Sequence, residues 1–150
     1  MHGILGTLAG ILLLAATGDA NAQTKPIEGN WRSPSGSIVR VYECGDAVCL
    51  KIMQVEKSAP GTEDANNPDP KLRSRSLCGL EIGSGFKPED GGKKADRGAL
   101  YDPKSGKTYS GVISAEGDLL RLRGYVGLKM FGRSEEWNRV NGPVDVCRGS

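Results

Sequence analysis

The polar residues that could most readily bind an ion lie between positions 56 and 77. Residues 62–69 include Asp64, Asn67 and Asp69, and carboxylate and amide oxygens of this kind are the ligands that calcium prefers. Their spacing does not match an EF-hand loop, which needs a central glycine and a distal glutamate. We therefore expect no metal here and predict that these side chains hydrogen-bond to their own backbone in Asx turns.

Two arginines, Arg73 and Arg75, follow this cluster. On an extended segment they point the same way, and together they could clamp a carboxylate or a phosphate. They could equally pair with Asp64 or Asp69 and pin the polar stretch to the body of the protein. We favour pinning and keep the anion site as the alternative.

The ionisable residues exclude several function classes. The sequence has one histidine, His2, at the N-terminus, so no Ser-His or Cys-His nucleophile pair is expected once that end is removed. Lys and Arg number 20 against 18 Asp and Glu, a balance that does not indicate a nucleic-acid binder. We expect no catalytic residue and no cofactor, and favour a binding protein. An enzyme that uses a pair of carboxylates is a remaining alternative.

The N-terminus resembles a secretory signal. Residues 3–17 are almost wholly apolar, but this run is short for a membrane span, which takes about 20 residues. Ala20-Asn21-Ala22 then supplies a small-x-small cleavage site. We predict a signal peptide at 1–22 and a single domain at 23–150, with a buried core helix as the alternative. Cleavage would remove His2 and Asp19 and raise the formal net charge from +2 to +3.

Export would place the four cysteines in an oxidising compartment, where disulfides persist. Cys44 and Cys49 flank a plausible tight turn, and their pairing would set Val41 opposite Ile52 and Tyr42 opposite Lys51. We therefore favour two bridges, Cys44–Cys49 and Cys78–Cys147, over free thiols. The C-x2-C pairs of a four-cysteine metal site are absent from the sequence.

The rest of the chain predicts short strands, because glycine and proline interrupt it about every 8–12 residues. Strands are expected at 29–31, 37–43, 50–55, 79–86, 98–101, 107–114, 119–125 and 134–140. Residues 56–77 and 87–97 are expected to be loops. Eight antiparallel strands favour an all-β, up-and-down barrel, which removes exposed sheet edges. A β-sandwich is the alternative.

Pairing Ser114 with Leu119 predicts the two faces of the hairpin at 107–125. One face is apolar and should line the barrel: Tyr109, Gly111, Ile113, Leu120, Leu122 and Gly124. In this register Tyr109 lies opposite Gly124 and covers its bare backbone. The outer face carries Arg121, Arg123 and Tyr125, which we interpret as a surface stripe, with an anionic-ligand or partner surface as the alternative.

Residues 124–132 join the last two strands and are apolar between glycines. Tyr125, Met130 and Phe131 suit contact with a hydrophobic ligand or partner. The other interpretation, equally open, is a loop folded over the barrel end as a plug.

Four stretches of the chain together resemble a bacterial family: Gly29-x-Trp31, Val-Tyr-Glu-Cys at 41–44, Asn67-Pro68-Asp69-Pro70-x-Leu72-Arg73-x-Arg75 and residues 98–140. This family consists of secreted proteins catalogued as domain of unknown function 2147. The resemblance covers nearly all of residues 23–150 and implies an exported, periplasmic-type protein without an established activity.

A looser resemblance links the chain to calycins, the lipocalin-like barrels. Their Gly-x-Trp motif is matched by Gly29 and Trp31, and the basic residue of their last strand by Arg139. The resemblance implies that Arg139 packs over the Trp31 indole at the closed end of the barrel. We therefore expect a carrier of a small apolar or amphipathic ligand, with Tyr109, Ile113, Leu120 and Leu122 around an open cavity. A protein-interaction or envelope-structural module with a filled core is the alternative.

Overall fold

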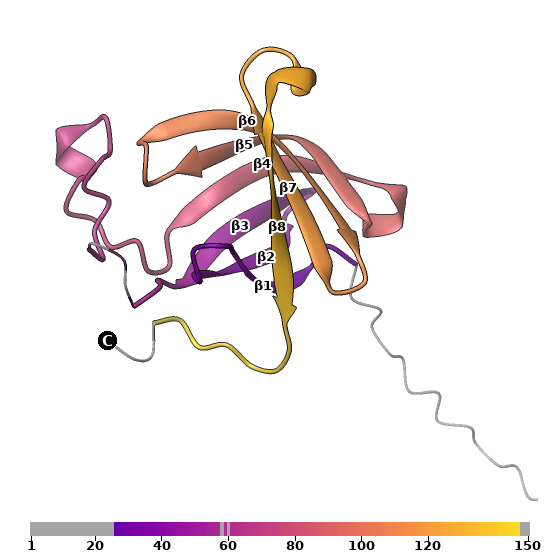
Figure 1. Ribbon diagram of the computed structural model, residues 1–150, viewed down its shortest axis with the longest axis horizontal. Coiled ribbons are helices and arrows are strands. Elements are labelled where there is room, and N and C mark those ends of the chain that lie inside the picture. Colours follow the sequence, from indigo (N-terminus) through magenta and orange to yellow (C-terminus); the bar gives the residue numbers. More distant parts are fainter. Residues whose placement is uncertain (1–25, 58, 60, 148–150) are drawn as a thin grey trace, which may run out of the picture.

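The protein is an eight-stranded antiparallel barrel, seen in a computed structural model that describes residues 26–57, 59 and 61–147 (Figure 1). Every strand pairs with the next in sequence, and the last pairs with the first. The strands are β1 (Gly29–Arg32), β2 (Ile38–Cys44), β3 (Ala47–Gln54), β4 (Glu81–Glu89), β5 (Lys94–Asp102), β6 (Lys107–Glu116), β7 (Leu119–Tyr125) and β8 (Arg133–Val140). The predicted up-and-down barrel is confirmed, and the sandwich is excluded.

The described residues also contain three short 3₁₀ turns, η1 (Pro70–Leu72), η2 (Asp90–Gly92) and η3 (Lys129–Phe131). No helix in this part of the chain is long and apolar enough to cross a membrane. The signal peptide predicted at 1–22 lies outside the described residues.

The prediction of a loop at 87–97 is wrong, because most of this segment belongs to the β4–β5 hairpin. The register places Lys87 opposite Asp96 and Glu89 opposite Lys94, and the second of these pairs forms an ion pair. Ala95 points inward and is buried. A strand needs an inward residue only at every second position, so a segment with many charges can still be a strand. High polarity alone therefore did not indicate a loop here.

The predicted register of the β2–β3 hairpin is wrong by two residues. Cys44 pairs with Ala47, so Val41 lies opposite Leu50 and Tyr42 opposite Cys49. Gly45, with φ +71°, allows a turn of only two residues. A shift of two residues keeps every side chain on its predicted face.

The β6–β7 hairpin shows the same shift. Ser114 pairs with Arg121, and Gly111 rather than Tyr109 lies opposite Gly124. Gly117, with φ +58°, supports the tight turn. Tyr109 still covers Gly124 on the diagonal, since a Cβ placed on this glycine would lie 3.6 Å from the Tyr109 Cβ.

One end of the barrel is closed by large side chains. Trp31 and Phe86 are fully buried there, together with Val41, Val48, Leu50, Ala95, Ile113 and Leu120. Phe86 fits because two facing positions are glycines. A Cβ on Gly111 would lie 2.9 Å from the Phe86 ring, and one on Gly98 would lie only 2.2 Å from it.

Candidate binding site

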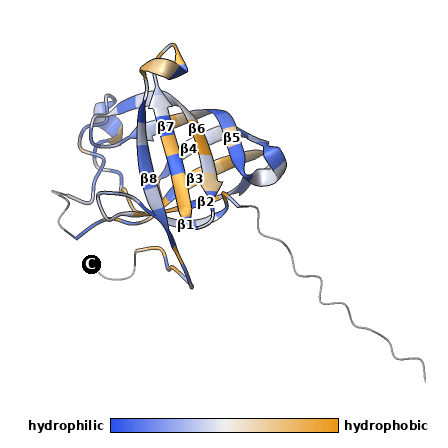
Figure 2. Cartoon of the chain, turned by 45° about the vertical axis from the view of Figure 1, so that its right-hand side comes forward, coloured by the Kyte–Doolittle hydropathy of each residue, from blue (hydrophilic) through white to orange (hydrophobic). Residues whose placement is uncertain are grey.

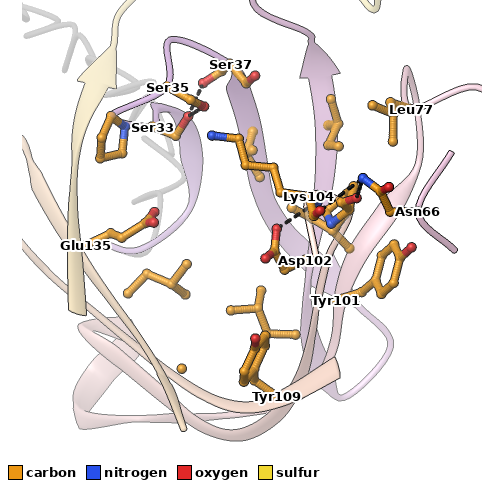
Figure 3. A pocket seen from close by; sticks show the side chains of 18 of the residues that line it. Ser33, Ser35, Ser37, Asn66, Leu77, Tyr101, Asp102, Lys104, Tyr109 and Glu135 are labelled. Carbon is orange, nitrogen blue, oxygen red and sulfur yellow. Dashed lines mark hydrogen bonds between the residues drawn. The ribbon is translucent and has the colours of Figure 1, made fainter. Parts of the chain in front are cut away.

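The other half of the barrel interior is a cavity of about 1210 Å³ that opens to solvent (Figure 3). Its wall is formed by inward side chains from seven strands, β2 to β8, and is largely apolar. These side chains include Val39, Ile52, Ile82, Leu100, Tyr109, Leu122 and Trp137. The volume is somewhat above the roughly 300–1,000 Å³ that is usual for small-molecule pockets, because the cavity continues past the strand ends between the loops.

The structure places two of the four predicted cavity residues in the wall. Tyr109 and Leu122 line the cavity. Ile113 and Leu120 do not, because they lie deeper and are fully buried in the closed end. The expectation that all four line the cavity is therefore wrong for Ile113 and Leu120. Trp31 and Phe86 fill the interior at the depth of Ile113 and Leu120.

The mouth of the cavity is polar. Ser33, Ser35 and Ser37 from the β1–β2 loop contribute hydroxyl groups, and Lys104 extends from the β5–β6 turn (Figure 3). Asp102 also lines the opening, and its side chain accepts hydrogen bonds within its own turn from the Lys104 N–H and the Ser105 hydroxyl. The site therefore joins an apolar interior to a rim of hydrogen-bonding groups.

Glu135 is a charged group on the inner face of the barrel that the sequence analysis missed. It pairs with Leu122 across β7 and β8, which turns its side chain inward. Its carboxylate accepts a hydrogen bond from the Trp137 indole N–H at 2.9 Å. Trp137 is a large apolar residue two positions further along the predicted strand at 134–140, so the two-residue period of a strand could have placed Glu135 on the same inward face.

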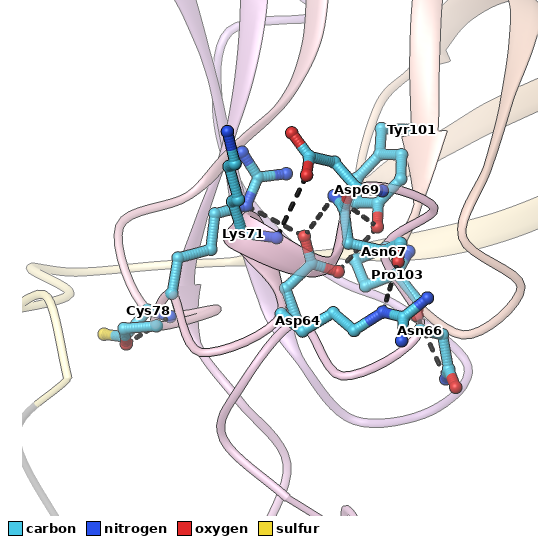
Figure 4. Close-up of polar contacts among 11 residues, drawn as sticks. Asp64, Asn66, Asn67, Asp69, Lys71, Cys78, Tyr101 and Pro103 are labelled. Carbon is cyan, nitrogen blue, oxygen red and sulfur yellow. Dashed lines mark hydrogen bonds and ion pairs between the residues drawn. The ribbon is translucent and has the colours of Figure 1, made fainter.

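Residues 55–80, here called the long loop, border the cavity and are held by a buried carboxylate (Figure 4). Asp64 is fully buried and accepts hydrogen bonds from the Tyr101 hydroxyl at 2.6 Å, the Asn67 amide at 2.8 Å and Arg75 Nε at 2.8 Å. Because Tyr101 belongs to β5, these contacts fix the loop to the barrel wall. We call these four residues the latch.

Burial by itself would raise the pKa of Asp64. The hydrogen bonds from Tyr101, Asn67 and Arg75 and the charge of Arg75 outweigh that effect and hold the pKa below its ordinary value. Burial and the neighbouring Asp64 carboxylate raise the pKa of Tyr101 in turn. The latch is therefore a charged carboxylate and a neutral phenol at neutral pH.

Two further polar side chains of the long loop bond within the loop. Arg73 Nε donates to the Asn67 carbonyl, and Asp69 accepts from the Lys71 N–H. Arg75 pairs with Asp64, one of the two carboxylates that the pinning interpretation names, whereas Arg73 bonds to a backbone carbonyl of the loop. Within the described residues, no three His, Cys, Asp or Glu side chains come together as metal ligands.

The predicted outer face of β7 divides into distinct parts. Arg121 is exposed and pairs with Glu136 on β8 at 2.8 Å. Arg123 donates to the carbonyls of Lys129 and Met130, so it holds the β7–β8 link. Tyr125 is buried and also borders the cavity.

The β7–β8 link does not plug the barrel. Met130 is 74% exposed and Phe131 75% exposed. The apolar part of the link projects away from the strands at the top of Figure 2. The interpretation as a plug is therefore wrong, although Val126, Phe131 and Gly132 of the link border the cavity.

Arg139 and Trp31 lie at the closed end in the arrangement that the calycin resemblance implies. The guanidinium carbon is 4.0 Å from the centre of the indole ring. Arg139 also donates to the carbonyls of Pro26 and Glu28. A Cβ on Gly29 would lie 2.9 Å from Arg139, so the small residue leaves room for the arginine.

Comparison with known sequences gives the family. The sequence model of an uncharacterized protein conserved in bacteria, DUF2147, matches residues 29–139, which span all of the barrel except its last residue. The chain belongs to the DUF2147 family. No curated protein matches the chain significantly in sequence.

Among solved structures, this DUF2147 barrel is similar to protein HP1028 from the human pathogen Helicobacter pylori, described as belonging to the lipocalin family. The TM-score is 0.70 and the sequence identity 22%, over 79% of this chain and 85% of that chain. The likeness shows that the fold is lipocalin-like.

The DUF2147 chain carries two disulfides, Cys44–Cys49 and Cys78–Cys147, which are the pairs that the sequence favours. Their Cα atoms are 5.9 and 6.0 Å apart, within the usual range for bridged cysteines. Because cytoplasmic thiols are normally kept reduced, the two bridges indicate a protein that folds outside the cytoplasm.

Proposed function

We propose that this DUF2147 protein binds a small apolar or amphipathic ligand in the barrel cavity, as an exported protein of the bacterial cell envelope. The observation that carries the proposal is the open cavity of about 1210 Å³, apolar inside and polar at its mouth. The apolar wall would hold the body of the ligand. A polar head group of the ligand would lie at the rim, close to the serines of the β1–β2 loop, Lys104 and Glu135.

The fold and the covalent structure support this proposal. Lipocalin-like barrels with eight strands are wide enough to hold one small ligand. The signal-like N-terminus and the two disulfides are consistent with export. The alternative, an envelope-structural module, predicts a filled barrel, but the half of the barrel interior next to the mouth is hollow.

The test is binding of N-phenyl-1-naphthylamine, an uncharged apolar dye whose fluorescence rises in apolar surroundings. Gly124 lies in the cavity wall, and a Cβ there would touch Tyr109 and Leu100 only at ordinary van der Waals distances. Gly124→Phe should therefore fold and place a ring where the dye would pack. We expect its affinity for the dye to fall by about tenfold, or 1.4 kcal/mol.

The matched control is Ser110→Phe, which adds the same ring to an exposed position on the neighbouring strand. We expect this variant to bind the dye like the unmodified protein. Circular dichroism should show the same strand content for both variants. No dye binding by the unmodified protein, or equal binding by the two variants, would contradict the proposal.

A further inference from the structure

The β7–β8 link gathers apolar side chains at the surface. We call four of its residues the apolar tip, and their side chains are 62–75% exposed: Val126, Leu128, Met130 and Phe131. Elsewhere in the described chain, only Leu72 and Val146 are large exposed hydrophobic residues. Soluble proteins rarely concentrate such residues in one exposed place without a binding role.

Polar contacts hold the tip in this exposed position. Arg123 Nε donates to the Lys129 carbonyl at 2.8 Å, and its Nη2 donates to the Met130 carbonyl at 3.2 Å. The Lys129 ammonium pairs with Asp96 on β5. Burial of Asp96 would raise its pKa, but the hydrogen bonds from Lys129 and the Arg97 N–H keep it low, so the anchor is charged at neutral pH.

Backbone packing restrains the base of the link as well. A Cβ on Gly132 would lie 2.5 Å from the Gly124 carbonyl oxygen and 2.8 Å from the Tyr125 Cβ, so the link sits directly against β7. The Phe131 and Gly132 N–H groups close the η3 turn onto Leu128 and Lys129. These contacts fix the base of the link, while the four apolar residues of the tip remain exposed.

The charges around the tip favour an anionic partner. Arg123 donates to two carbonyls and to the Ser134 hydroxyl. Arg133 is exposed. Among the contacts of the described residues, neither arginine is paired with a carboxylate. Both flank the tip, at the end of β7 and the start of β8. An apolar protrusion with basic residues at its base matches a bilayer with anionic headgroups, where side chains enter the acyl boundary and arginines meet phosphates.

The position of the tip relative to the cavity agrees with such a partner. Val126 and Phe131 belong both to the tip and to the cavity lining. We propose that the apolar tip docks this protein on an anionic lipid surface, with the cavity mouth turned toward the bilayer. The docking does not require that the cavity bind a ligand, so the two proposals can fail separately.

The test is co-flotation of the protein with vesicles of phosphatidylcholine alone or mixed with an equal part of phosphatidylglycerol. We expect binding to the mixed vesicles that weakens as salt is added, because exposed charges are screened. Met130→Ser/Phe131→Ser should reduce this binding at least about tenfold, since it removes two of the four apolar anchors.

The control is Leu72→Ser/Val146→Ser, which removes the two exposed apolar residues outside the tip. This variant should float like the unmodified protein. No binding to anionic vesicles, or an equal loss in both double variants, would overturn the proposal. So would a concentration-dependent dimer in light scattering that only the tip variant abolishes, because the tip would then be covered by a second copy.

A single substitution gives an independent readout. Phe131→Trp places an indole on the tip, and Val146→Trp places one on the C-terminal segment. The emission of the first should shift to the blue with anionic vesicles, while that of the second should not. Emission at Phe131→Trp that is unchanged by the vesicles would contradict insertion of the tip.

Discussion

Arg139 shows how one side chain can close an end of the barrel. It lies over the Trp31 ring and donates to three backbone carbonyls, those of Pro26, Glu28 and Gly117. These carbonyls come from the segment before β1 and from the β6–β7 turn. Arg139 therefore joins three parts of the chain that are remote in sequence, through a planar group with several donors.

We predict that Arg139→Lys lowers the free energy of unfolding by about 2 kcal/mol, because an ammonium cannot reach these carbonyls together and stacks less well on the indole. The measurement is denaturation in urea followed by tryptophan fluorescence. The control is Arg121→Lys, whose exposed pair with Glu136 should contribute less than about 1 kcal/mol. Equal losses in the two variants would contradict this role of Arg139.

At the scale of elements, the latch decides whether the long loop stays on the barrel. The pKa of Asp64 is lower in the folded protein than its ordinary value. Its contribution to stability is therefore present at and above that ordinary value, about 3.9, and is lost as the pH falls through the lower folded pKa. Acid should release the loop, because protonation removes the charge that Arg75 faces.

We predict that Asp64→Asn reproduces this release at neutral pH and destabilises the loop by about 2–3 kcal/mol, since its amide cannot accept all three hydrogen bonds. Hydrogen exchange of the Asp64 and Leu77 amides, which bond across the loop to Arg75 and Thr62, would measure it. The control is Asp69→Asn, an exposed cap of the Lys71 N–H. Unchanged protection in Asp64→Asn would show that the latch does not hold the loop.

The sequence predicted the strands of the last third well, because inward and outward residues alternate clearly from Tyr109 to Tyr125. It did not predict the registers, since a shift of two residues leaves both faces unchanged and only the glycine dihedrals of the turns distinguish them. The partnership of Tyr101 with Asp64 was missed for a related reason, because it joins residues 37 positions apart in sequence and local pattern does not contain such a pairing. Glu135 differs, since the two-residue period of its own strand places it on the face of Trp137.

At the scale of the whole molecule, the C-terminal segment runs back along the outside of the barrel. The Cys147 N–H donates to the Met53 carbonyl at 2.9 Å, and Arg40 donates to the Val144 carbonyl at 3.2 Å. The Cys78–Cys147 bridge then joins this segment to the long loop across 69 positions of sequence. Cys44–Cys49 spans only 5 positions within one hairpin.

The two bridges should therefore differ in their effect on the free energy of unfolding. Chain entropy predicts a loss of about 4 kcal/mol for Cys78→Ala/Cys147→Ala and about 2 kcal/mol for Cys44→Ala/Cys49→Ala, because the unfolded chain gains more freedom from the larger loop. Urea denaturation of the two double variants would measure this difference. Neither bridge contributes a cysteine to the cavity wall, so dye binding should persist in both folded variants. If Cys44→Ala/Cys49→Ala lowered the free energy of unfolding more, the Cys44–Cys49 bridge would stabilise the protein mainly by holding the β2–β3 turn rather than by restricting the unfolded chain.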